Sequence, residues 1–148
     1  MITREKRLKK AYVLLALNLM VIWGNSLLPG EISGAISGFV RDLIAMLLPG
    51  DGDPSQGHGL LRKLAHFTEF ACLGAILCRI MGLLDKHWLI ALGFGFLAAC
   101  VDETIQMFVP DRGPAFTDVL IDTSGVLCGI FLLLAVIRLR RKKIKVNE

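Results

Sequence analysis

The sequence predicts an all-α polytopic membrane protein, in which four transmembrane helices form a bundle and an amphipathic helix lies between the first and second spans. The 148 residues are 54% hydrophobic and have a mean hydropathy of +0.61, which is more apolar than an ordinary soluble domain. Four apolar stretches approach the roughly 20 residues that a helix needs to cross a bilayer. Basic residues crowd both ends of the chain, and each cluster adjoins an apolar stretch.

The predicted spans cover residues 11–28, 64–84, 88–109 and 118–137. The first span follows a basic segment, as the apolar run of a signal peptide does. Its apolar run is long, however, and no A-x-A-like cleavage site follows it, so we interpret it as a retained span. No internal repeat or low-complexity tract divides the chain, and residues 1–148 are expected to form one domain.

The distribution of lysine and arginine predicts the orientation of these spans. Five basic residues lie within the first ten positions and six within the last eleven. If both termini are cytoplasmic, the outer side carries only Arg41, Arg62, Lys63 and Arg112. Because cytoplasmic loops carry the excess of basic residues, we expect both the N-terminus and the C-terminus to lie in the cytoplasm. Nucleic-acid binding is a poorer explanation for basic ends that adjoin apolar runs, and we expect no nucleic-acid partner.

Residues 29–63 form the predicted outer segment between the first two spans. Its stretch EISGAISGFVRDLIAMLLP begins after Pro29 and ends at Pro49. Apolar residues recur there at the i, i+3 and i+4 spacing of one helix face, namely Ile32, Ile36, Phe39, Val40, Leu43, Ile44 and Leu47. We expect an amphipathic helix that lies on the outer surface or covers the bundle. Residues 51–59, DGDPSQGHG, are a predicted turn-rich connector.

Polar residues occur within the predicted spans themselves. In the second span Arg62, His66 and Glu69 are spaced i, i+4 and i+7, so a helix places them on one face. In the first span Asn18 and Asn25 are expected to form hydrogen bonds between helices. Ionisable residues inside a span are costly, and they mark a functional site by default.

The third and fourth spans carry further acids. Asp102 and Gln106 share one face of the third span, and Glu103 points about 100° away from them by the helical period. Asp118 and Asp122 are one helical turn apart on the fourth span. These residues could line the same pocket as the face of the second span.

The depths of the acids agree between helices that run in opposite directions. At 1.5 Å per residue, Glu69 lies about 8 Å, Asp102 about 10 Å and Asp122 about 6 Å below the outer end of its span. Beneath the acids of the fourth span, Gly125 and Gly129 form a GxxxG pattern, which permits close helix approach. We therefore predict one outward-facing polar pocket.

Positive and negative charges do not balance in this layer. Three cations (Arg62, Lys63 and Arg112) accompany six carboxylates, those of Glu69, Asp102, Glu103, Asp111, Asp118 and Asp122. An uncompensated buried carboxylate is costly. Some acids are therefore protonated, or His66 is charged, or a metal or cationic ligand group lies among them, or the loop acids are solvated. The alternative is that these groups pair with one another and only hold the helices together.

Three segments, RKLAHFTEFACLG, DETIQMFVPDR and DVLIDTSGVLCG, occur in this order on separate predicted spans. They resemble the VanZ-like membrane proteins of bacteria, a family named for a protein associated with resistance to the glycopeptide teicoplanin. The resemblance covers residues 61–130 and departs from the family pattern at Phe70, Ile105 and Asp111, where Tyr, His and Gly are common. The matching positions are Arg62, Lys63, His66, Phe67, Glu69, Gly74, Asp102, Glu103, Gln106, Phe108, Pro110, Arg112, Asp118, Gly125 and Gly129.

The first functional hypothesis, which the resemblance supports, is a bacterial cell-membrane protein that binds an envelope lipid headgroup or a cell-wall-related ligand and modulates glycopeptide susceptibility. Arginine and lysine at the outer rim would hold a phosphate or carboxylate, and the acids beneath would hold an amine or an ion. Its partners would be membrane lipids and a lipid-linked or glycopeptide ligand. The predicted ligand-binding residues are Arg62, Lys63, His66, Glu69, Asp102, Glu103, Gln106, Arg112, Asp118 and Asp122.

Two alternatives stay open. In an intramembrane enzyme acting on a lipid headgroup, His66 with Glu69 would supply a base and the group that orients it, and Asp102 a second acid or base. No HExxH or GxSxG signature appears, and no cofactor or metal-ligand set is predicted, although a histidine with carboxylates could hold a divalent metal. A proton- or cation-coupled transporter is favoured by the buried acids and disfavoured by the lack of an inverted repeat. Any of these proteins could form an oligomer.

Overall fold

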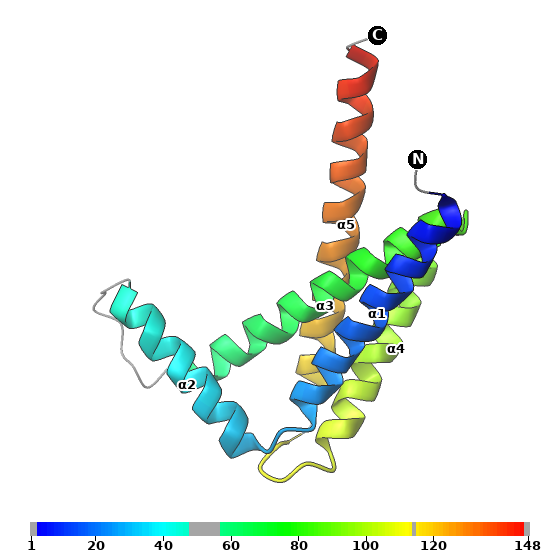
Figure 1. Cartoon of the computed structure of the whole chain (residues 1–148). Helices are drawn as coiled ribbons and strands as arrows, with labels where there is room; N and C mark the ends of the chain where they lie inside the picture. Colours follow the sequence, from blue (N-terminus) through cyan, green and yellow to red (C-terminus); the bar gives the residue numbers. More distant parts are fainter. Residues whose placement is uncertain (1–2, 48–56, 114, 147–148) are drawn as a thin grey trace.

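The computed structural model confirms the all-α class. It describes residues 3–47, 57–113 and 115–146, and these ranges contain helices and no strand. The helices are α1 (Arg4–Ser26), α2 (Gly30–Leu47), α3 (Gly57–Leu83), α4 (Trp88–Gln106) and α5 (Phe116–Val146). Figure 1 shows both termini at the same end of the bundle. The opposite end, where α1 turns into α2 and α4 is joined to α5, is called the distal end below.

Three helices of the described residues are long and apolar enough to cross a membrane, and they contain the segments Leu61–Leu83, Trp88–Gln106 and Phe116–Lys143. The predicted first span meets this standard only when α1 is joined with the start of α2 (Gly30–Ile36), and that pair is bent by 111°. The charged residues at the start of α1, together with the polar side chains of Asn18 and Asn25, lower its hydropathy. The chain therefore has three candidate spans, or four if the bent pair counts as one.

Several helix ends differ from the predicted bounds. α3 already begins at Gly57, so the last three residues of the predicted connector 51–59 are helical, while residues 51–56 lie outside the described part. The cost of roughly 1 kcal/mol for each helical glycine is offset because the helix continues directly into an apolar run. α5 continues to Val146 instead of ending near residue 137, because its basic end consists of good helix formers.

α2 is helical as predicted, but its described apolar side chains do not pack into the bundle. Ile32, Ile36 and Phe39 are 49%, 51% and 71% exposed. Gly30, the first residue of α2, donates its N–H to the carbonyl oxygen of Pro110 at 3.2 Å. The elbow between α1 and α2 is therefore held against the loop that joins α4 to α5, while Ile32, Ile36 and Phe39 keep large parts of their side chains exposed.

α3 packs against every other helix, and its longest contact is with α5. Glycines bring these two backbones together. A Cβ atom at Gly125 would lie 2.5 Å from the carbonyl oxygen of Phe67, and one at Gly129 would overlap with the carbonyl oxygen of Ala71. The predicted GxxxG contact is thus a contact between α5 and the backbone of α3.

Val126 joins this helix pair to α4. Its side chain is fully buried, and a Cβ atom at Gly95 of α4 would lie 2.5 Å from its Cγ1 atom. On the other side, a Cβ atom at Gly74 of α3 would overlap with the carbonyl oxygen of Val126. Three helices therefore converge on one residue below the polar layer.

We expect Gly129→Ala to lower the stability of the protein. The added Cβ would meet the backbone of Ala71, which cannot move without a shift of α3, and overpacking of this kind costs about 1–3 kcal/mol. The matched control is Gly93→Ala on α4, where nothing lies within 4 Å of an added Cβ. Thermal unfolding in detergent should show a lower midpoint for Gly129→Ala alone, and equal midpoints for the two variants would contradict the contact.

Candidate functional site

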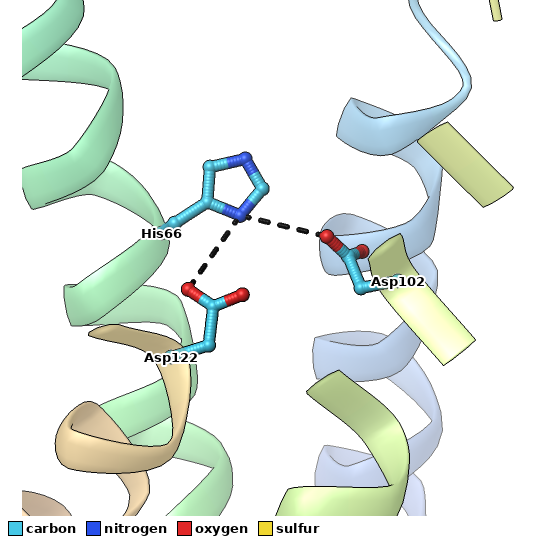
Figure 2. Close-up of side chains that lie close together, drawn as sticks. All are labelled: His66, Asp102 and Asp122. Carbon is cyan, nitrogen blue, oxygen red and sulfur yellow. Dashed lines mark ion pairs between the residues drawn. The ribbon is translucent and has the colours of Figure 1, made fainter. Parts of the chain in front are cut away.

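A histidine and two aspartates meet at the distal end, each from a different helix. His66 Nδ1 of α3 lies 3.7 Å from Asp102 Oδ2 of α4 and 4.0 Å from Asp122 Oδ1 of α5. Figure 2 shows the imidazole ring between the two carboxylates. Asp102 and Asp122 are buried, with 0% and 1% exposure. The structure therefore brings together three of the predicted site residues.

Asp102 is held by hydrogen bonds to both of its carboxylate oxygens. Ser26 Oγ, at the last residue of α1, donates to Oδ1 at 2.6 Å. Gln106 Nε2 donates to Oδ2 at 2.8 Å. Ser26 was not among the predicted site residues. It lies two residues from the end of the predicted span 11–28, about 3 Å in, so counting depth did not link it to Asp102. These bonds fix the Asp102 side chain and tie α1 to α4.

Glu69 pairs with α1 and not with His66. Asn25 Nδ2 donates to Glu69 Oε1 at 2.6 Å, and Asn18 Nδ2 donates to the backbone carbonyl of Glu69 at 3.4 Å. The two asparagines thus join helices as predicted. The predicted arrangement of His66 with Glu69 as its orienting group is not the one observed, because within the described residues the acids beside the imidazole are Asp102 and Asp122.

Arg112 lies deeper than its predicted place at the rim. Its side chain is buried, with Nε donating to the carbonyl of Leu28 at 3.0 Å and Nη2 donating to that of Asn25 at 2.9 Å. Asn25 lies in the last turn of α1, where carbonyls lack their usual partner four residues on, and its oxygen also accepts from the N–H of Leu28 at 3.2 Å. Leu28 follows the helix directly. Burial lowers the pKa of Arg112 below its usual range, and the nearby charge of Arg62 lowers it further. The guanidinium stays charged because its ordinary pKa is so high.

The remaining predicted residues lie around this centre. Arg62 Nη2 and Lys63 Nζ are 3.9 Å and 3.5 Å from the carboxylate oxygens of Asp118. These partly exposed pairs contribute little to stability. Glu103 is buried, and its Oε2 accepts a hydrogen bond from the backbone N–H of Ala115 at 3.0 Å. It therefore holds the loop between α4 and α5.

Two cavities adjoin the centre, and His66 and Arg62 line both. The larger, about 100 Å³, lies between α1, α2 and α3 and is called the headgroup cavity below; it is lined by Asn25, Leu28, Ser33, Ile36, Arg62, Ala65, His66, Glu69 and Arg112. The smaller, about 10 Å³, is called the acidic cavity and is lined by Arg62, Lys63, His66, Glu103, Gln106, Asp118, Ile121 and Asp122.

A larger cavity of the described residues lies elsewhere. It measures about 770 Å³ and occupies the end of the bundle near the termini, where α3 and α5 diverge. Its lining is mainly apolar, with basic residues such as Arg79 and Arg138. It contains none of the buried polar residues, so its size alone does not make it the candidate site.

The comparisons with known proteins agree with the predicted resemblance. A model of the VanZ/LLP1 family matches residues 9–138. The chain belongs to the VanZ/LLP1 family. The match extends beyond the segment 61–130 that carried the resemblance and includes most of α1 and all of α2. Neither the curated proteins nor the solved structures contain a match to the chain. With its apolar helices, the chain is an all-α, multi-pass membrane protein of this family.

Five buried polar atoms around the site of this VanZ/LLP1 protein have no hydrogen-bond partner among the described residues. Two of them, Glu69 Oε2 and Arg112 Nη1, are on residues that line the headgroup cavity. The other three are Glu103 Oε1, Gln106 Oε1 and Asp122 Oδ2, on residues that line the acidic cavity. Buried polar atoms are normally hydrogen-bonded, so each of these atoms calls for an explanation.

Replacing Ser26 by alanine should destabilise the VanZ/LLP1 protein, since Asp102 Oδ1 would lose its donor in a buried site. A buried acceptor left without a partner costs about 1–3 kcal/mol. The control is Ser124→Ala, because the exposed hydroxyl of Ser124 bonds only to the carbonyl of Ile121 in its own helix. Thermal midpoints in detergent would distinguish the two variants. If both fell by the same amount, the bond between Ser26 and Asp102 would not be a stabilising one.

Proposed function

We propose that this VanZ/LLP1 protein binds the headgroup of an envelope lipid, or of a cell-wall-related amphiphile, in the headgroup cavity. One observation carries this proposal. Glu69 Oε2 is an acceptor without a donor and Arg112 Nη1 is a donor without an acceptor, both among the described residues, and the two side chains line one cavity. A ligand with a phosphate or carboxylate next to an amine or hydroxyl would satisfy both.

The charges around the headgroup cavity favour such a ligand. Arg62 and Arg112 both line it, and a guanidinium holds phosphate or carboxylate oxygens with two parallel hydrogen bonds. Glu69 offers a carboxylate oxygen on the other side, while Asn25 holds its second oxygen in place. A headgroup that carries both signs of charge would be compensated at each end, which lowers the cost of burying it.

The apolar surface next to the cavity favours a ligand with an acyl chain. Ile36 lines the headgroup cavity and is also half exposed. Ile32 and Phe39, on the same helix, are exposed too. The acyl chain would lie along α2 while the polar group enters between the helices. This division of polar and apolar contacts suits an amphiphile better than a freely soluble ion.

We further propose that the site faces outward across the cell membrane and that both termini are cytoplasmic. The excess of lysine and arginine near the two termini supports this orientation, because cytoplasmic segments carry that excess. α1 would serve as the first of four spans, because Asn18 and Asn25 bond it side by side to α3. α2 would then lie along the outer surface, since it bends away from α1 by 111°.

The size of the headgroup cavity limits the link to teicoplanin. Its volume of about 100 Å³ corresponds to only about three water molecules, at ~30 Å³ each. It suits a small polar group and not a whole glycopeptide. We therefore propose that any effect on teicoplanin susceptibility comes through the lipid or cell-wall precursor that the cavity holds, and not through binding of the antibiotic.

One observation favours an intramembrane enzyme as the second candidate. His66 lines the headgroup cavity, and Asp102 Oδ2 lies 3.7 Å from its Nδ1. An imidazole that faces a headgroup with a carboxylate behind it is a potential general base. In this version Asp102, and not Glu69, would orient the histidine.

Binding to phosphatidylethanolamine in detergent micelles tests the proposed function. We expect native mass spectrometry to show that this lipid binds at least about tenfold more tightly than diacylglycerol, which lacks the phosphate and the amine. Glu69→Gln should remove most of the difference, because a charge-assisted hydrogen bond contributes roughly 1.5–3 kcal/mol. The control is Glu31→Gln, which makes the same chemical change on the exposed side of α2.

Equal binding of the two lipids, or equal binding by Glu69→Gln and the unmodified protein, would count against the headgroup site. The same spectra separate the two candidate functions. A new headgroup product that needs His66 would favour the enzyme, whereas unchanged lipid would favour binding alone.

A further inference from the structure

Three buried oxygen atoms on residues that line the acidic cavity lack hydrogen-bond donors. Asp122 Oδ2, Glu103 Oε1 and Gln106 Oε1 have no hydrogen-bond partner among the described residues, and their side chains lie on residues that are 1%, 6% and 2% exposed. All three line this cavity, and all three atoms are oxygens that accept hydrogen bonds. In the headgroup cavity, by contrast, one donor and one acceptor lack partners. What the acidic cavity lacks is therefore positive charge or protons, and not an anion.

The nearby cations are engaged elsewhere. Arg62 and Lys63 line the acidic cavity but lie beside Asp118 at its rim. Arg112 directs two of its nitrogens to backbone carbonyls at the end of α1. The carboxylates of Asp102 and Asp122 therefore face each other across His66 without a full basic partner in the described part of the chain. Two carboxylates this close repel each other when both are ionised, and a divalent cation would remove that repulsion.

The three side chains offer their ligand atoms to a common point. His66 Nδ1 and one oxygen each from Asp102 and Asp122 all lie within 4.8 Å of one another. The histidine is 3.7 Å from the first oxygen and 4.0 Å from the second. Ligands held at about 2.1 Å in a tetrahedral site lie roughly 3.4 Å apart. Small side-chain rotations would therefore bring the three atoms to bonding distance without moving the helices.

We propose that His66, Asp102 and Asp122 bind one divalent transition-metal ion, of the class of Zn²⁺ or Mn²⁺. Imidazole suits zinc, and carboxylates suit manganese as well as zinc. Two ionised carboxylates balance the charge of the ion. Ser26 and Gln106 already orient the Asp102 carboxylate through hydrogen bonds, as partners behind metal ligands commonly do.

The unpaired oxygens of Glu103 and Gln106 lie on residues that line the same acidic cavity as Asp122 and His66. A water molecule bound to the ion would complete its coordination and could donate hydrogen bonds to these oxygens. The metal site does not depend on the headgroup proposal, because Glu69 and Arg112 are not among its ligands.

Metal content of the full-length protein tests the proposal. The protein is purified in detergent with a chelator, then equilibrated with micromolar ZnCl₂ or MnCl₂, and bound metal is measured by inductively coupled plasma mass spectrometry. We expect one ion per chain, with at least tenfold weaker binding in Asp122→Asn and in His66→Gln. Asp111→Asn is the matched control, since it removes an exposed carboxylate at the same end of the protein.

A folded, monodisperse protein that binds neither ion at one per chain would overturn the site, and so would stoichiometric binding that survives in both Asp122→Asn and His66→Gln. The metal-dependent rise in the thermal midpoint of the unmodified protein gives a second readout that does not depend on the variants folding well. Phosphatidylethanolamine binding is measured separately with the chelated protein. Failure of the metal site and failure of the headgroup site are therefore distinguishable.

Discussion

The backbone contact between α3 and α5 determines where the polar residues of this protein lie. Gly125 faces the carbonyl of Phe67, and Gly129 faces that of Ala71. His66 directly precedes Phe67, and Asp122 lies one helical turn before Gly125, so the glycine contact also sets the distance of 4.0 Å between the histidine and the aspartate. A larger residue in this contact would separate the helices and with them the two walls of the site.

The membrane imposes a second constraint, because hydrocarbon offers no hydrogen bonds to buried polar groups. Among the described residues, most polar side chains at the distal end are satisfied within the bundle, by Ser26 and Gln106 on Asp102 or by Asn25 on Glu69. Five of the buried atoms without partners lie on residues that line the two cavities. The unpaired atoms differ between the cavities: a donor and an acceptor belong to one, and only acceptors belong to the other. The two cavities therefore suit different ligands.

The helices and the polar layer could be predicted from the sequence, whereas the pairing of individual side chains could not. Counting residues from the end of each span gave the common depth of Glu69, Asp102 and Asp122, because helical rise is regular. Depth says nothing of rotation about the helix axis, so Glu69 was expected beside His66 and is bonded to Asn25. Arg112 was expected at the rim but is buried. Its partners are backbone carbonyls, and no sequence pattern marks such partners. The end of the connector could not be predicted either, because α3 begins at Gly57 and its first turn contains the glycines at 57 and 59.

An experimental density map of the protein in lipid nanodiscs tests the central idea that buried, unpaired groups at the distal end hold a ligand. We expect density in the headgroup cavity, within hydrogen-bond distance of both Glu69 Oε2 and Arg112 Nη1. The contrary result would be a map in which these two atoms bond directly to each other or to other side chains of the chain, with no density between them. The polar residues would then serve only to join the helices.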